Sequence, residues 1–150
     1  MKLGDLAGAV GKGLFAGAAG TAAMTVSSTL EMKLRGRAAS SAPATAASKV
    51  LGVEPTGEKE KERFSNIVHW GYGTGWGAAR GALGALGLSG TGATAAHFGA
   101  VWGSEQVMLP ALGVAPPFWT WGAKEVAIDA FHHAVYVAAT SAAYELLDRG

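Results

Sequence analysis

Long stretches of small apolar residues alternate with short polar segments along the chain. The segments Gly13–Leu30 and Gly81–Ser104 contain no Asp, Glu, Lys or Arg, whereas Met32–Arg63 is rich in charge and is interrupted by prolines. The first segment is close to the roughly 17 residues that a helix needs to cross a hydrocarbon layer. The pattern predicts one membrane domain over residues 1–150, with helices at about 6–30, 66–86, 91–109 and 120–147 and a polar loop at 32–63.

Glycines recur at intervals of four residues within the predicted helices. In a water-soluble helix each glycine costs about 1 kcal/mol relative to alanine, whereas in lipid small residues let helix backbones approach closely. The predicted fold class is therefore all-α, a four-helix integral membrane bundle. The alternatives are a soluble helical domain and, for the first helix, a secretory signal. The glycines expected at helix contacts are Gly13, Gly17, Gly73, Gly77, Gly81, Gly99 and Gly103.

Charge and cysteine content narrow the classes of partner and site. Charged residues make up 15% of the chain and the net charge is +1, which argues against the dense basic face that nucleic-acid binding requires. The chain has no cysteine, so disulfides and zinc–thiolate sites are excluded. We expect the lipid bilayer as the main partner, with self-association or docking to a larger membrane complex through the glycine-rich faces.

Polar residues share one face of the predicted helix 120–147. Glu125, Asp129, His132 and Tyr136 are separated by four, three and four residues, and His133 lies on the flank of that face. A charged group at the centre of a bilayer costs at least about 2.5–3.5 kcal/mol, so such a stripe should turn inward.

Residues of the neighbouring helices should lie next to this stripe at successive depths in the membrane. Alternating helix directions place the start of the second helix, the end of the third and the start of the fourth on the same side. Arg80 falls near the opposite end of the second helix and is expected to extend to the far interface, with an internal counter-ion as the alternative. The predicted polar column comprises His69, Glu105 and Glu125 at its mouth, then Asp129, then His97 with His132 or His133, and Tyr136 on the same face.

Three functions suit such a column. Histidine changes charge near neutral pH, so a proton relay or a path for a small polar solute is one hypothesis. A structural or interaction subunit, in which Asp129 and His133 hold two helices in register, is the second. A metal-dependent membrane enzyme is the third, because neutral His and carboxylates suit Fe, Mn or Zn. No cofactor is predicted beyond that metal ion, and no nucleophile, phosphate-loop or dinucleotide motif indicates an enzyme.

Three segments resemble the YagU-like family of small bacterial inner-membrane proteins: "HWGYGTGWGAARGALG", "VWGSEQVMLPALGVAPP" and "DAFHHAVYVAATSAAYELLDR". The resemblance covers about Val68 to Arg149. It implies a multi-pass helical protein of the bacterial inner membrane, with a link to acid or envelope stress, and it implies no catalytic residue or substrate. His132 stands where the family usually has Gly, and Arg80 stands where an aromatic residue is common. The matching positions are His69, Gly71, Gly73, Gly77 and Gly81, then Trp102, Glu105, Pro110, Gly113, Pro116 and Pro117, then Asp129, His133 and Tyr136.

Overall fold

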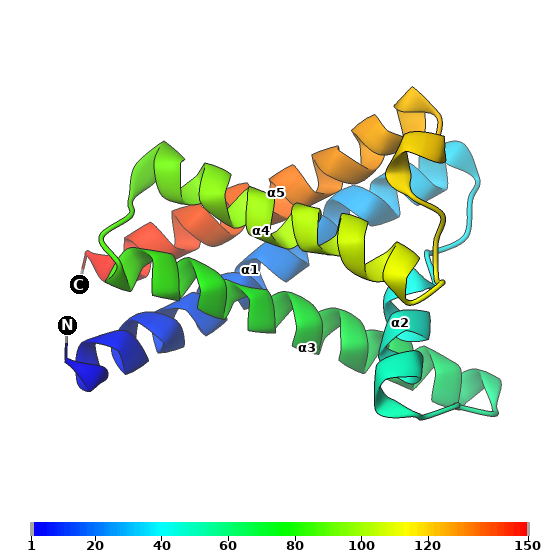
Figure 1. The fold of residues 1–150 in the computed structure, drawn as a ribbon, viewed down its shortest axis with the longest axis horizontal. Coiled ribbons are helices and arrows are strands. Elements are labelled where there is room, and N and C mark those ends of the chain that lie inside the picture. Colours follow the sequence, from blue (N-terminus) through cyan, green and yellow to red (C-terminus); the bar gives the residue numbers. More distant parts are fainter. Residues whose placement is uncertain (1, 150) are drawn as a thin grey trace.

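The computed structural model describes residues 2–149 and is all-helical, which confirms the predicted all-α class (Figure 1). Both termini lie at one end of the molecule, and α2 lies at the other end. The C-terminal ends of α1 and α4 and the N-terminal ends of α3 and α5 therefore lie toward the same end of the molecule as α2. The helices are α1 (Leu3–Arg35), α2 (Ala42–Leu51), α3 (Glu58–Ala85), α4 (Gly90–Ala111) and α5 (Ala123–Asp148), with a short 3-10 helix, η1 (Phe118–Thr120), before α5.

The segment predicted as a polar loop, 32–63, contains more helix than expected. It holds the end of α1, all of α2 and the first turns of α3. Pro43 sits in the first turn of α2, where its missing N–H has no helical partner to lose. Gly36 and Gly52 end α1 and α2 in the left-handed region, with φ of 63° and 65°. Proline and mixed charge predict a loop with, at most, a short surface helix in "ASKVLG" at 47–52, so the first half of α2 is the part that the sequence did not indicate.

Glycine contacts hold α1 against α3. A Cβ atom on Gly17 would lie 2.8 Å from the Cα of Gly77, and a Cβ on Gly77 would lie 2.6 Å from the Cα of Gly17. Gly13 and Gly81 make the same kind of backbone approach, and Gly73 faces the side chain of Thr21. Helix α1 thus packs closely on α3, as the four-residue spacing predicts.

The predicted packing role of Gly99 and Gly103 in α4 is not observed. A Cβ atom at either position would meet nothing within 4 Å. The four-residue spacing places both glycines on one side of α4, but it does not indicate which side faces a neighbour. Helix α4 is therefore held by side chains rather than by close backbone approach.

Polar side chains are buried and many large apolar side chains are exposed. Arg80 and His97 are among the largest fully buried side chains. By contrast, Phe15, Ile67 and Val107 are each more than 70% exposed, at 77%, 71% and 72%. Among residues 2–149, no helix has both the length and the apolar character of a membrane-crossing segment.

Candidate functional site

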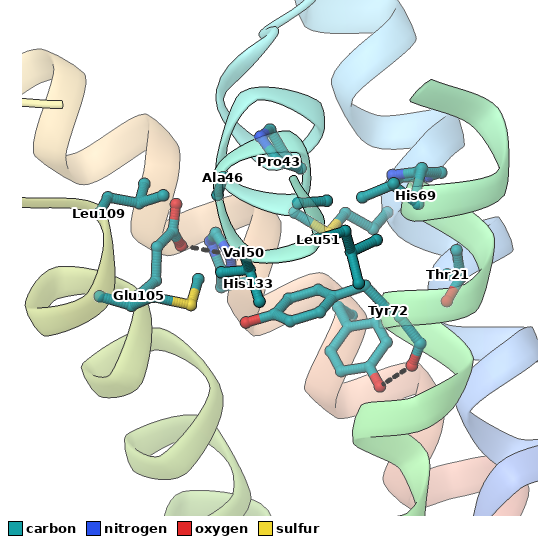
Figure 2. A pocket seen from close by; sticks show the side chains of 16 residues that line it. Thr21, Pro43, Ala46, Val50, Leu51, His69, Tyr72, Glu105, Leu109 and His133 are labelled. Atoms are coloured by element: carbon teal, nitrogen blue, oxygen red, sulfur yellow. Dashed lines mark hydrogen bonds and ion pairs between the residues drawn. The ribbon is translucent and has the colours of Figure 1, made fainter. Parts of the chain in front are cut away.

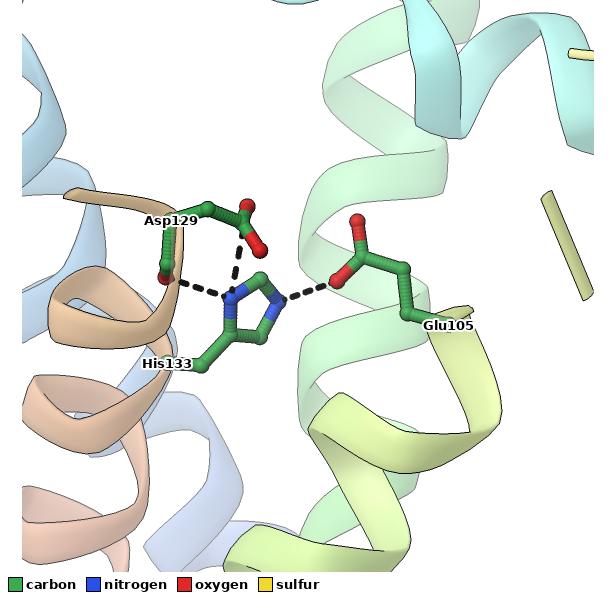
Figure 3. A group of neighbouring side chains, drawn as sticks. All are labelled: Glu105, Asp129 and His133. Atoms are coloured by element: carbon green, nitrogen blue, oxygen red, sulfur yellow. Dashed lines mark hydrogen bonds and ion pairs between the residues drawn. The ribbon is translucent and has the colours of Figure 1, made fainter. Parts of the chain in front are cut away.

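Asp129, His133 and Glu105 form a compact group between α4 and α5, called the acid–histidine cluster below. Asp129 and His133 are four residues apart and so share one face of α5. His133 Nε2 lies 2.8 Å from a carboxylate oxygen of Glu105, and its Nδ1 lies 3.7 Å from Asp129 Oδ1. Figure 3 shows the imidazole ring between the two acids. Each ring nitrogen therefore has a carboxylate on its own side.

Two hydrogen bonds orient this cluster. His133 Nδ1 lies 2.9 Å from the main-chain oxygen of Asp129, which can accept its proton. Trp102 Nε1 donates to Asp129 Oδ2 at 2.8 Å, and the indole ring of Trp102 stacks on Phe98. Trp102 precedes Glu105 by three residues on α4, and this spacing could have indicated from the sequence that the two share a face. The indole fixes the Asp129 carboxylate against α4.

The ligand atoms of the cluster lie within 4.8 Å of one another, so the donor set could hold a metal ion. The donors do not converge on one nitrogen, however, because Glu105 faces Nε2 and Asp129 faces Nδ1. A single ion bound at Nε2 would have Glu105 as its nearest carboxylate partner. The distances are compatible with an ion held by the three residues and with a proton passed across the ring.

An apolar cavity of about 370 Å³ adjoins the cluster. Glu105 and His133 contribute to its wall, and α2 covers it with Ala46, Val50 and other residues (Figure 2). Tyr136 also lines the cavity, and its hydroxyl donates to the main-chain oxygen of Gly73 at 2.6 Å. The cluster is thus open to an internal space rather than sealed between helices.

The remaining residues of the predicted column do not all reach this site. His69 lines the cavity, where its Nε2 lies 2.7 Å from Thr25 Oγ1. His97 is fully buried behind the cavity wall, with its ring centroid 5.8 Å from that of Tyr136, and pairs with the main-chain oxygen of Trp76 at 3.0 Å. The single column is therefore wrong in its extent, because α3 and α4 turn these two histidines toward different neighbours.

His132 faces α1 instead of the cavity. Its Nδ1 lies 2.9 Å from Ser27 Oγ, and its Nε2 lies 3.8 Å from Glu31. Adjacent residues of a helix point about 100° apart, so His132 and His133 cannot both face α4. Of the two histidines that the sequence left as alternatives, His133 is the one in the cluster.

Glu125 belongs to an ion-pair network at the helix ends, beyond the charge-free part of α1. Arg35 Nη1 lies 3.0 Å from Glu125 and 2.9 Å from Glu31, and Arg37 also pairs with Glu31. The hydrogen bond with Arg37 is the main reason that the pKa of Glu31 falls from 4.5 to about 2. Hydrogen bonds to Glu125 and Glu31 raise the pKa of Arg35. Glu125 thus joins α5 to α1 rather than forming the mouth of a column.

Arg80 does not extend to an interface, as the sequence predicted, but lies inside the bundle. It is 1% exposed, and its Nε donates to Ser141 Oγ at 3.2 Å. Its Nη2 lies 3.6 Å from Glu145, and its guanidinium lies 4.4 Å from the ring centroid of Tyr144. A planar guanidinium can pair and stack at once, which explains how α5 accommodates it.

No protein-family model, curated protein or solved structure matches this chain. A function for this chain therefore rests on its own residues and, for the bacterial inner membrane, on the resemblance of its sequence to the YagU-like family.

Proposed function

We propose that this chain is a multi-pass protein of the bacterial inner membrane in which the acid–histidine cluster moves protons to and from the cavity. The observation that carries the proposal is the position of His133 between two carboxylates, one at each ring nitrogen. An imidazole can accept a proton at one nitrogen and release another from the opposite nitrogen. Glu105 is already at hydrogen-bond distance from Nε2, and the 3.7 Å between Nδ1 and Asp129 Oδ1 must shorten for the second transfer.

The membrane part of the proposal is supported by where side chains lie, not by the hydropathy of any one helix. Large apolar side chains such as Phe15 and Val107 are exposed, while Arg80, His97 and His132 are buried. In water, each Å² of apolar surface that stays exposed forgoes about 25 cal/mol of favourable burial free energy. In lipid it is favourable, because ionisable groups turn inward and pair.

Each residue of the cluster has its own part in the relay. Glu105 lines the cavity, so it exchanges protons with whatever occupies that space. His133 passes a proton between Glu105, at 2.8 Å, and the side of the ring that faces Asp129. Asp129 Oδ1, at 3.7 Å, is the next carboxylate on that side. Trp102 is a positioning residue, because it holds the other oxygen of Asp129.

The proposal is tested by reconstituting the full chain in liposomes that contain a pH-sensitive dye. We expect Asp129→Asn to lower the proton flux under an imposed pH gradient about tenfold or more, since removing a general acid–base group has effects of that size or larger. Glu125→Gln is the matched control, because Glu125 pairs with Arg35 outside the cluster. Equal flux in the wild type and in Asp129→Asn would refute the relay.

A structural function for the same residues makes a different prediction. In that case Asp129→Asn would lower the thermal stability, through loss of charge beside His133, and would leave the proton flux unchanged. Measuring flux and unfolding temperature on the same preparations separates the two functions.

A further inference from the structure

The cavity beside the cluster has the size and lining of a small-molecule site. Its volume of about 370 Å³ lies within the roughly 300–1,000 Å³ of typical ligand pockets. Met24, Leu51, Val68 and Met108 give it an apolar wall. A proton or a water-sized solute needs no wall of this kind, so the cavity calls for an apolar occupant.

The charge at the cavity favours a cation. Among residues 2–149, the lining has one Asp or Glu side chain, Glu105, and neither Lys nor Arg; its other titratable groups are His69, His133 and two tyrosines. Lys49 lies close by on α2, but its ammonium donates to the main-chain oxygens of Leu112 and Gly113 at the end of α4. An anionic head group would therefore meet the carboxylate of Glu105, with a protonated histidine as the cation available in the described lining.

Glu105 offers its carboxylate at the same place. Its Oε2 is buried and lies 2.8 Å from His133 Nε2, so a cation at this carboxylate competes with His133 for it. Hydrogen bonds and ion pairs to a carboxylate are stronger when the donor is charged, so a positive charge is stabilised there. The rings of Tyr72 and Tyr136 also line the cavity and offer faces to a cation.

We infer that the cavity binds a lipophilic organic cation, an amine or quaternary ammonium whose apolar body lies under α2 and whose charged nitrogen lies at Glu105. This inference rests on the proposed function, because it uses the carboxylate that exchanges protons with the cavity. The cation and the proton of His133 then compete for the same carboxylate. A cation bound at Glu105 weakens the hold of that carboxylate on the His133 proton, so binding favours release of this proton.

The test uses benzyltrimethylammonium and, as a matched anion, benzenesulfonate. Both are titrated by calorimetry into the full chain in nanodiscs of zwitterionic lipid, with empty nanodiscs subtracted. We expect saturable binding of the cation, no binding of the anion, and a loss of cation affinity of about tenfold or more in Glu105→Gln, which removes a charged partner. Absence of cation binding, or equal affinities for cation and anion, would overturn the inference.

Two variants of α2 test the place of binding without touching the carboxylate. Ala47 lines the cavity, whereas Ala44, on the same helix, does not. Ala47→Trp should fill the space and abolish cation binding, and Ala44→Trp should leave it intact. Equal binding to both variants would show that the cation lies elsewhere and would refute the inference.

The outcome also distinguishes this inference from the proposed function. Proton flux that depends on Asp129 in a chain that binds no cation would remove the inference alone. Cation binding that depends on Glu105, with flux indifferent to Asp129, would remove the relay and leave an organic-cation site.

Discussion

The contact between α1 and α3 allows a substitution whose effect can be worked out from the structure. In Gly77→Ala, the new Cβ would lie 2.6 Å from the Cα and 2.7 Å from the nitrogen of Gly17. Unbonded carbon atoms prefer about 3.5–4.0 Å, so the two helices must separate by about 1 Å. Both opposing atoms are main chain, and no side-chain rotation can relieve the contact. Overpacking of this kind costs about 1–3 kcal/mol.

The control is Gly99→Ala, because a Cβ at Gly99 meets nothing within 4 Å. Both substitutions gain the same helix propensity, about 1 kcal/mol, and this gain cancels in their comparison. We therefore expect Gly77→Ala to be less stable than Gly99→Ala by about 1–3 kcal/mol.

Thermal unfolding followed by circular dichroism, in one detergent, measures this difference. For a chain of this size each kcal/mol shifts the unfolding temperature by about 2–4 °C, so the two variants should differ by several degrees. If Gly77→Ala unfolds at or above the temperature of Gly99→Ala, the backbone contact between α1 and α3 does not exist as described.

Two further predictions concern buried and paired charges. Because the folded protein lowers the pKa of Glu31 from 4.5 to about 2, its network adds stability above about pH 4.5 and loses it as the pH falls through about 2. The difference in unfolding temperature between wild type and Glu31→Gln should shrink as the pH falls from about 4.5 to about 2. A difference that does not change with pH would contradict the lowered pKa of Glu31. Arg80→Ala should be less stable than Arg80→Met by about 2 kcal/mol, because alanine leaves a void in a buried site. Chemical unfolding of both variants checks this, and equal stabilities would show that Arg80 is not packed as observed.

The sequence was most informative where spacing alone decides geometry. The four-residue interval between Asp129 and His133 places them on one face, and the position of Glu105 near the end of α4 brings it to the same level. The interval between Gly13 and Gly17 likewise indicated a helix contact that is observed with α3. Periodicity within one helix predicts such features without knowledge of the neighbouring helices.

The rotation of each helix about its axis could not be predicted in the same way. Apolar residues of α5 occur all around the helix axis. For example, Phe131 is exposed although the next residue, His132, is buried. No polar face therefore marks the outside of the helix, and the sequence could not determine that His132 faces α1. The burial of Arg80 was missed for a related reason, since its partners Ser141 and Glu145 lie about sixty residues away in the chain.

Gly99 and Gly103 of α4 do not pack against another helix, and this affects how Glu105 is held in the site. Helix α1 approaches α3 at Gly17 and α5 at Gly20, where an added Cβ would lie 2.7 Å from the main-chain oxygen of Tyr136. These three helices meet through main-chain contacts, whereas Glu105 is carried by a helix whose Gly99 and Gly103 make no such contact among the described residues. The rate of proton transfer depends steeply on the gap between donor and acceptor. The 2.8 Å between Glu105 and His133 is therefore set by the side chains of α4, such as Trp102, and not by its backbone.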